Sequence, residues 1–186
     1  AYNNIGIILI DVGNTDKAIT NFKKAIAINP DFLDAYNNLG NALCSRNELN
    51  AGIKIYNQAI MLKPDSAELL NNMGIALQSN NDLENAINNY AKAIRIRLDF
   101  DEAYFNLALA LKNAIFTIPN TEMQKIIVSI LIRKTYVKPE DILKASISLL
   151  KSDPNIQNII KNLSIDKPKK LFQEVVPVLN NIPLLL

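Results

Sequence analysis

The sequence predicts an all-α fold, a solenoid of 34-residue helix–turn–helix repeats followed by a C-terminal helical cap. Three observations lead to this prediction. The first part of the chain repeats itself with a fixed period, and its apolar residues fall at helical spacing without any run of period two. The 186 residues also include only five glycines and eight prolines, too few for a loop-rich chain.

The repeat is visible in four segments that begin alike at a constant offset of 34 residues. They start at Ala1, Ala35, Leu69 and Ala103 and read Ala-Tyr-Asn-Asn-Ile-Gly, Ala-Tyr-Asn-Asn-Leu-Gly, Leu-Leu-Asn-Asn-Met-Gly and Ala-Tyr-Phe-Asn-Leu-Ala. A fixed period of this length is typical of stacked pairs of helices. We therefore expect repeats at 1–34, 35–68 and 69–102, the first helix of a fourth repeat at 103–113, and a helical cap or linker subdomain at 114–186.

Each repeat is expected to open with a helix that carries one apolar stripe. The stripe is Tyr2, Ile5, Gly6 and Leu9, then Tyr36, Leu39, Gly40 and Leu43, then Leu70, Met73, Gly74 and Leu77. A glycine within a helix costs about 1 kcal/mol relative to alanine, so the sequence predicts a close approach of the partner helix at each glycine. The turn that follows falls at Gly13, Asn47 and Asn81, residue types that tolerate the left-handed conformation after a helix.

Each second helix is expected to pack through small residues around one aromatic side chain. These residues are Ala18, Phe22 and Ala25, then Gly52, Tyr56 and Ala59, then Ala86, Tyr90 and Ala93. Pro30 and Pro64 should end the first two of these helices, because a proline ring cannot continue a helix.

The fourth copy departs from the pattern after Lys112 and is followed by an insert up to Asn120. A new helix is expected after the insert, with Thr121 and Gln124 spaced like a capping box. Further helices are expected at 139–151, 154–163 and 168–180. We expect these helices to cap the array, because a solenoid otherwise leaves the apolar face of its last repeat in water.

Through residue 102 the sequence resembles the tetratricopeptide repeat family, whose pattern of aromatic, Leu, Gly, Ala, aromatic, Ala and Pro it fills in phase. Leu70, Gly52 and Leu98 depart from that pattern, at the first aromatic, the first alanine of the second helix and the final proline. The resemblance implies a right-handed superhelix with its first helices on the concave side, and a protein or an extended peptide as the partner. We expect no cofactor and no metal.

Two columns of asparagine on the first helices are the candidate peptide-binding residues. One column is Asn4, Asn38, Asn72 and Asn106, and the other is Asn3, Asn37 and Asn71. A carboxamide offers both donors and an acceptor, which suits a peptide backbone. The repeats of protein O-linked N-acetylglucosamine transferases are similar and use such an asparagine ladder, whose matching positions here form the first column. The hypothesis requires that Asn4, Asn38, Asn72 and Asn106 have no intramolecular partner; the alternative is that these asparagines are solvated or cap local backbone.

Other polar residues on the first helices, Asn41 and Gln78 among them, complete the candidate surface. Ile7 and Ile75 either grip apolar ligand side chains or pack on the neighbouring repeat. A paired Lys/Arg clamp for a terminal carboxylate, as in chaperone-binding members of the family, is absent from these positions.

The residue inventory argues against an enzyme. The chain has no histidine, so imidazole catalysis and histidine metal ligation are excluded, and Cys44 has no cationic cluster to activate it. A net charge of +2 gives no overall attraction to nucleic acid or membranes. The basic run at 167–170 is interpreted as a solvated helix start. One cysteine and no signal peptide favour a cytoplasmic location.

Two functions therefore remain. The first is a scaffold that binds a protein or peptide, with self-association left open. The second is a substrate-docking fragment of a larger transferase, either a glycosyltransferase or a methyltransferase, because residues 138–154 faintly resemble the segment that follows the repeats in bacterial tetratricopeptide–methyltransferase fusions. The in-phase start and the apolar end of the chain suggest a fragment of a longer protein.

Overall fold

The computed structural model describes residues 1–112, 114–115, 120–133, 144–146 and 148–149. It divides the chain into two compact units, Ala1–Leu111 and Lys112–Leu186, and each is described by itself. All the regular structure in the described residues is helical, as the sequence predicted.

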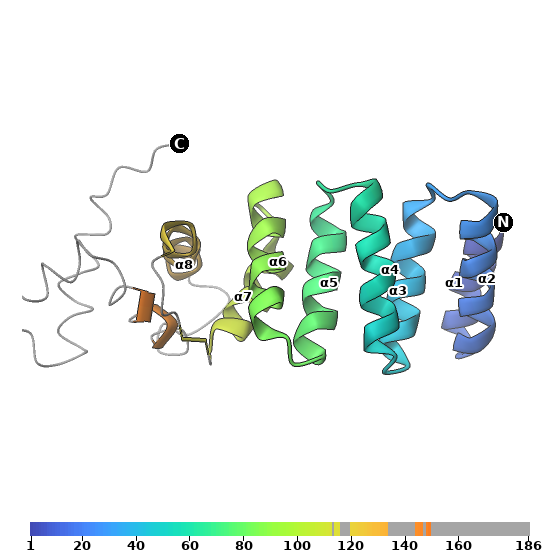
Figure 1. Cartoon of the computed structure of the whole chain (residues 1–186), viewed down its shortest axis with the longest axis horizontal. Coiled ribbons are helices and arrows are strands. Elements are labelled where there is room, and N and C mark those ends of the chain that lie inside the picture. Colours follow the sequence, from blue (N-terminus) through green and yellow to red (C-terminus); the bar gives the residue numbers. More distant parts are fainter. Residues whose placement is uncertain (113, 116–119, 134–143, 147, 150–186) are drawn as a thin grey trace, which may run out of the picture. The chain divides into compact units, whose positions relative to one another are not determined.

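The first unit is a row of helices in which each helix packs on the next (Figure 1). They are α1 (Tyr2–Asp11), α2 (Thr15–Ile28), α3 (Leu33–Ser45), α4 (Leu49–Leu62), α5 (Ala67–Ser79), α6 (Leu83–Ile96) and α7 (Asp101–Leu111). Odd-numbered helices are the first helices of successive repeats, and they also contact each other directly, α1 with α3, α3 with α5 and α5 with α7. This double set of contacts makes the unit a helical solenoid.

The turns inside the repeats adopt the left-handed conformation that the sequence predicted. The backbone φ angle is +76° at Gly13, +63° at Asn47 and +61° at Asn81. The second helices then begin at capped residues in two of three cases, because Asn14 accepts a hydrogen bond from the amide of Lys17 and Asp82 accepts one from the amide of Asn85.

The glycines of the first helices lie under the aromatic rings of the second helices, which confirms the predicted close approach. A Cβ atom added to Gly40 would lie 2.6 Å from Cε1 and Cζ of Tyr56, and one added to Gly74 would lie 2.5 Å from Cε1 of Tyr90. Phe22 covers Gly6 in the same way. These rings are almost fully buried, so each glycine makes room for the main aromatic group of its repeat.

Gly52 stands where the other repeats have alanine, and Cys44 explains the difference. A Cβ atom on Gly52 would lie 2.5 Å from Sγ of Cys44 and 3.2 Å from the carbonyl oxygen of Gly40. The sulfur therefore occupies the space that the alanine methyl group fills in the neighbouring repeats.

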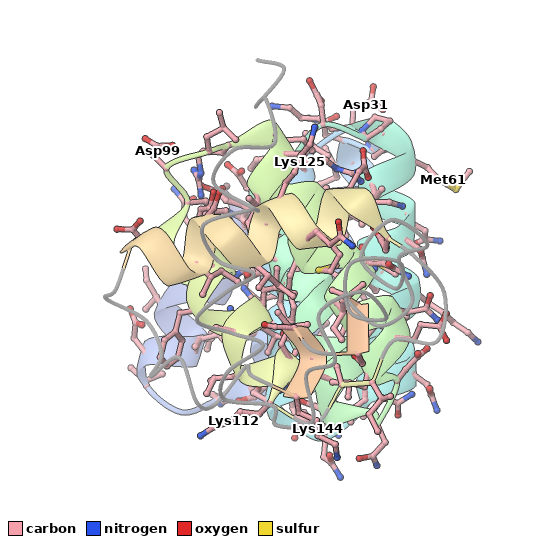
Figure 2. The ribbon with its side chains drawn as sticks, turned by 90° about the vertical axis from the view of Figure 1, so that its left-hand side faces the viewer. Asp31, Met61, Asp99, Lys112, Lys125 and Lys144 are labelled. Atoms are coloured by element: carbon pink, nitrogen blue, oxygen red, sulfur yellow. The ribbon has the colours of Figure 1, made fainter. Side chains whose placement is uncertain are left out.

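The second helices end at equivalent positions, Ile28, Leu62 and Ile96, whether or not a proline follows. After α6, Leu98 replaces the proline, yet Arg97 takes nearly the same backbone conformation as Asn29 and Lys63, which precede Pro30 and Pro64. The Arg97 guanidinium group stacks 3.7 Å from the ring centre of Phe100 and lies 3.3 Å from Oε1 of Glu68, contacts that fix the chain after the helix. At the end of α4, Met61 is 83% exposed and points away from the ribbon (Figure 2).

The second unit contains α8 (Thr121–Arg133), which begins where a helix was expected. The predicted capping box is wrong by one residue, because Oδ1 of Asn120 accepts from the amide of Met123 at 2.9 Å. Asn120 is the better cap since its carbonyl oxygen also accepts the first intrahelical bond, from the amide of Gln124. The helices expected at 154–163 and 168–180 and the basic run at 167–170 lie outside the described residues. The same holds for 139–151 except 144–146 and 148–149, which are helical.

Candidate functional site

The first helices of the solenoid are joined by one hydrogen bond that recurs at every junction between repeats. Nδ2 of Asn38 donates to Oδ1 of Asn3 at 3.0 Å. The next junction has the same bond from Asn72 to Asn37, at 2.8 Å, and the third has it from Asn106 to Asn71, at 3.0 Å. We call these three bonds the carboxamide ladder. It fixes the register of neighbouring first helices.

The ladder corrects the sequence-based hypothesis about these asparagines. Asn4, Asn38, Asn72 and Asn106 were expected to lack intramolecular partners, and that expectation is wrong for Asn38, Asn72 and Asn106, which donate to Asn3, Asn37 and Asn71. The reason is geometric: the donor column of one repeat stands opposite the acceptor column of the preceding repeat. Asn4, in the first repeat, is exposed, and its side chain makes no hydrogen bond within the part of the chain that the structure describes.

Asn71 is the most buried member of the ladder, with 1% of its surface exposed. Its Oδ1 accepts from Asn106, and its Nδ2 donates to Oε1 of Glu102 at 3.1 Å. Both partners belong to α7, so one side chain of α5 holds two consecutive turns of the neighbouring first helix.

Asn41 and Gln78, two further candidates, accept hydrogen bonds from the buried tyrosines. The Tyr56 hydroxyl donates to Oδ1 of Asn41 at 2.5 Å, and the Tyr90 hydroxyl donates to Oε1 of Gln78 at 2.9 Å. Burial raises the pKa of both tyrosines, with a smaller contribution from Cys44 at Tyr56 and from Glu102 at Tyr90. Both hydroxyls therefore stay protonated and continue to donate.

One helical turn beyond the ladder, the first helices expose a second column of side chains. Its members are Ile7, Asn41, Ile75 and Leu109, and the three apolar ones are 42%, 40% and 40% exposed. The ladder sets their spacing, because Ile75 follows Asn72 by three residues, as Leu109 follows Asn106. Ile7 and Ile75 are thus accessible to a ligand.

Sequence reasoning missed Phe105, which is 44% exposed. It occupies the position of Asn3, Asn37 and Asn71 in the fourth repeat, and it lies one turn before Leu109 on α7. The sequence signal that could have identified Phe105 is the replacement of the repeated asparagine by phenylalanine in the fourth copy. We call Ile75, Phe105 and Leu109 the apolar corner.

The charges on the first helices have one sign. The segments α1, α3, α5 and α7 contain no lysine or arginine, whereas they contain Asp11, Asp34, Glu68, Asp101 and Glu102. Lys112 follows α7 directly and Glu68 is paired with Arg97, which reduces the acidic excess, but the remaining charge still favours a neutral or basic ligand over an acidic one.

Cys44 is expected to be a slow nucleophile. Burial raises the pKa of its thiol above the ordinary value, so at neutral pH a smaller fraction is thiolate than in a free cysteine. Alkylation by iodoacetamide, followed by mass spectrometry from pH 7 to pH 10, should be slower than that of a cysteine-containing peptide, with its midpoint at higher pH. An equal rate and an equal midpoint would contradict this expectation.

Among the described residues, no group of His, Cys, Asp and Glu side chains is placed to hold a metal ion. None of the helices in the described part of the chain has the length and apolar character needed to cross a membrane.

The fold is similar to several solved structures. The first TPR of Spaghetti (RPAP3), solved with the HSP90 peptide SRMEEVD, is 19% identical, with a TM-score of 0.57 over 59% of this chain and 86% of that chain. MamA is 22% identical, with a TM-score of 0.57 over 84% of this chain and 79% of that chain. Thermobaculum terrenum O-GlcNAc transferase is 19% identical, with a TM-score of 0.59 over 71% of this chain. This chain spans only 25% of that transferase, and at these identities the likeness is one of fold.

A family model described as TPR repeat matches residues 6–45, 40–81 and 76–114, which together make up more than half of the chain. No curated protein matches the sequence. The 34-residue period, the paired helices and the family model agree, and we conclude that the chain belongs to the tetratricopeptide repeat family.

Proposed function

We propose that this chain is a scaffold that binds an extended polypeptide on the face formed by its first helices. The observation that carries the proposal is the exposed column beside the carboxamide ladder, where three apolar side chains and one carboxamide follow one another over four repeats. Exposed apolar side chains in a continuous row, beside polar groups fixed by a rigid framework, are a common basis for peptide binding.

The ladder contributes to this site even though its members are paired. An asparagine side chain has two donor hydrogens and an acceptor oxygen with two lone pairs, and each ladder bond uses one donor and one lone pair. The oxygens of Asn38, Asn72 and Asn106 accept no hydrogen bond from the described part of the chain. In the proposed complex these oxygens, with Asn4 and the amide groups of Asn41 and Gln78, contact the ligand backbone.

The ladder also improves binding indirectly. A side chain that is already held in one rotamer loses less conformational entropy when the ligand binds, so its contact contributes more to the binding free energy. In this proposal the asparagines are a preorganised frame, and the apolar column supplies most of the contact area.

The test uses a peptide obtained by library selection against the full chain. The proposal predicts that Ile75→Asp weakens the binding of this peptide by about tenfold or more. The reason is that a buried Ile contributes about 1.5–3 kcal/mol and a buried unpaired carboxylate adds a further cost. The measurement is fluorescence anisotropy with the labelled peptide, together with thermal unfolding of each variant.

Ile96→Asp is the matched control for this experiment. Ile96 is 44% exposed against 40% for Ile75, but it lies at the end of a second helix. It should leave the affinity unchanged. Equal losses in the two variants, or no loss in either, would show that the peptide does not bind on the first helices.

A further inference from the structure

The spacing of the first helices points to the conformation of the ligand. Neighbouring first helices contact each other and are joined through the carboxamide ladder. Helices in such contact have axes about 8–10 Å apart. Successive members of the exposed column are therefore presented at intervals of about that length.

A polyproline II helix has the same repeat. It has three residues per turn and rises about 3.1 Å per residue, so every third side chain returns to the same face after roughly 9 Å. In a β-strand the same face returns after two residues, or about 6.6 Å, which fits the column poorly. A polyproline II chain makes no internal hydrogen bonds, so its backbone groups are free to meet the carboxamides.

The column also sets the order of side chains that such a ligand would need. From α7 back to α1 it reads Leu109, Ile75, Asn41 and Ile7, that is, two apolar positions, one polar position and one apolar position. Phe105, one turn before Leu109 on α7, is also exposed. The two neighbouring apolar positions, Leu109 and Ile75, belong to the apolar corner, where a ligand would bury the most apolar surface.

We propose, on the basis of the function proposed above, that the ligand is a segment in the polyproline II conformation with two bulky apolar side chains three residues apart, bound on the apolar corner. The segment is free of acidic residues, because the first helices contain five acidic residues and no basic ones. Its flanking backbone follows the ladder toward α3.

The test uses the full chain and a set of labelled peptides rich in proline and glutamine. Each peptide carries two leucines, two, three or four positions apart, and a fourth peptide has the three-residue spacing with two added glutamates. The spacing between the two leucines is the same whichever way the peptide runs along the face, so the test does not depend on the orientation of the bound peptide. The three-residue spacing should bind about fivefold or more tightly than the others, since a shift of one residue removes one leucine from its contact. The added glutamates should weaken binding.

Two variants make the outcomes distinguishable. Ile75→Asp should remove the preference for three-residue spacing, and Ile96→Asp should preserve it. A preference for two-residue spacing, or no preference, with binding still sensitive to Ile75→Asp would overturn the polyproline II inference and leave the proposed function standing. If no peptide bound, or if Ile75→Asp did not change the affinity, both the polyproline II inference and the proposed function would be wrong. Dimerisation of the free chain, abolished by Ile75→Asp in light scattering, would assign the apolar corner to a second copy and overturn the inference.

Discussion

Replacing Gly40 by alanine is expected to lower the free energy of unfolding by about 1–2 kcal/mol, although alanine is the better helix former. The new methyl group would lie 2.6 Å from two ring atoms of Tyr56. That ring is 1% exposed, and its hydroxyl is held by Asn41, so it has no room to move. Overpacking of this kind costs about 1–3 kcal/mol, which exceeds the gain of up to about 1 kcal/mol in helix propensity.

The measurement is urea unfolding followed by circular dichroism, and the second background is Tyr56→Leu. Without the ring, Gly40→Ala should be neutral or stabilising, because only the propensity term remains. If Gly40→Ala stabilised the protein with Tyr56 present, the glycine would not be explained by the aromatic ring. Equal destabilisation in both backgrounds would lead to the same conclusion.

Replacing Asn71 by alanine should cost about 2 kcal/mol of unfolding free energy, because a buried polar partner left without its hydrogen bond costs about 1–3 kcal/mol. The change removes the acceptor for Asn106 and the donor to Glu102 together. Glu102 is exposed and regains water, whereas the amide of Asn106 is half-buried and does so less well. Thermal unfolding of the variant should therefore occur at a lower temperature.

Asn4→Ala is the control for this effect. Asn4 stands in the same column as Asn106 but is exposed and makes no ladder bond, so its replacement should change stability by no more than about 0.5 kcal/mol. Similar melting temperatures for Asn71→Ala and the unmodified chain would show that the ladder adds nothing to stability. A large loss for Asn4→Ala would show that the column acts in some other way.

The fold could be predicted because the residues that determine its turns and its close helix contacts are recognisable from their type and position in the repeat. Gly13, Asn47 and Asn81 recur in phase and mark the turns, because few residue types tolerate a positive φ angle. The glycines of the first helices predicted a close neighbour, and the rings of Phe22, Tyr56 and Tyr90 supply it. In each case one residue and its local conformation were enough for the prediction.

The pairing within the candidate site depends on the stacking of whole repeats, and a single repeat does not contain that information. Asn38 and Asn3 are 35 residues apart, and only the packing of α3 against α1 brings their side chains together. Asn41 and Gln78 were recognised as polar and accessible, but their bonds to Tyr56 and Tyr90 depend on how deeply each ring enters its repeat. The cap of α8 was misplaced because Asn120 and Thr121 are both suitable residue types, and backbone geometry decides between them.

The carboxamide ladder has a consequence for how the gene can change. Its donor and its acceptor occupy adjacent positions in the repeat, so the second repeat carries both halves of the bond. Duplication or loss of an internal block of 34 codons would therefore create a junction that already has both partners. The fourth repeat differs, because Phe105 replaces the acceptor. A unit added directly after α7 would have no acceptor for its asparagine, so that junction would lack the ladder bond, whereas a unit inserted within the array would keep it.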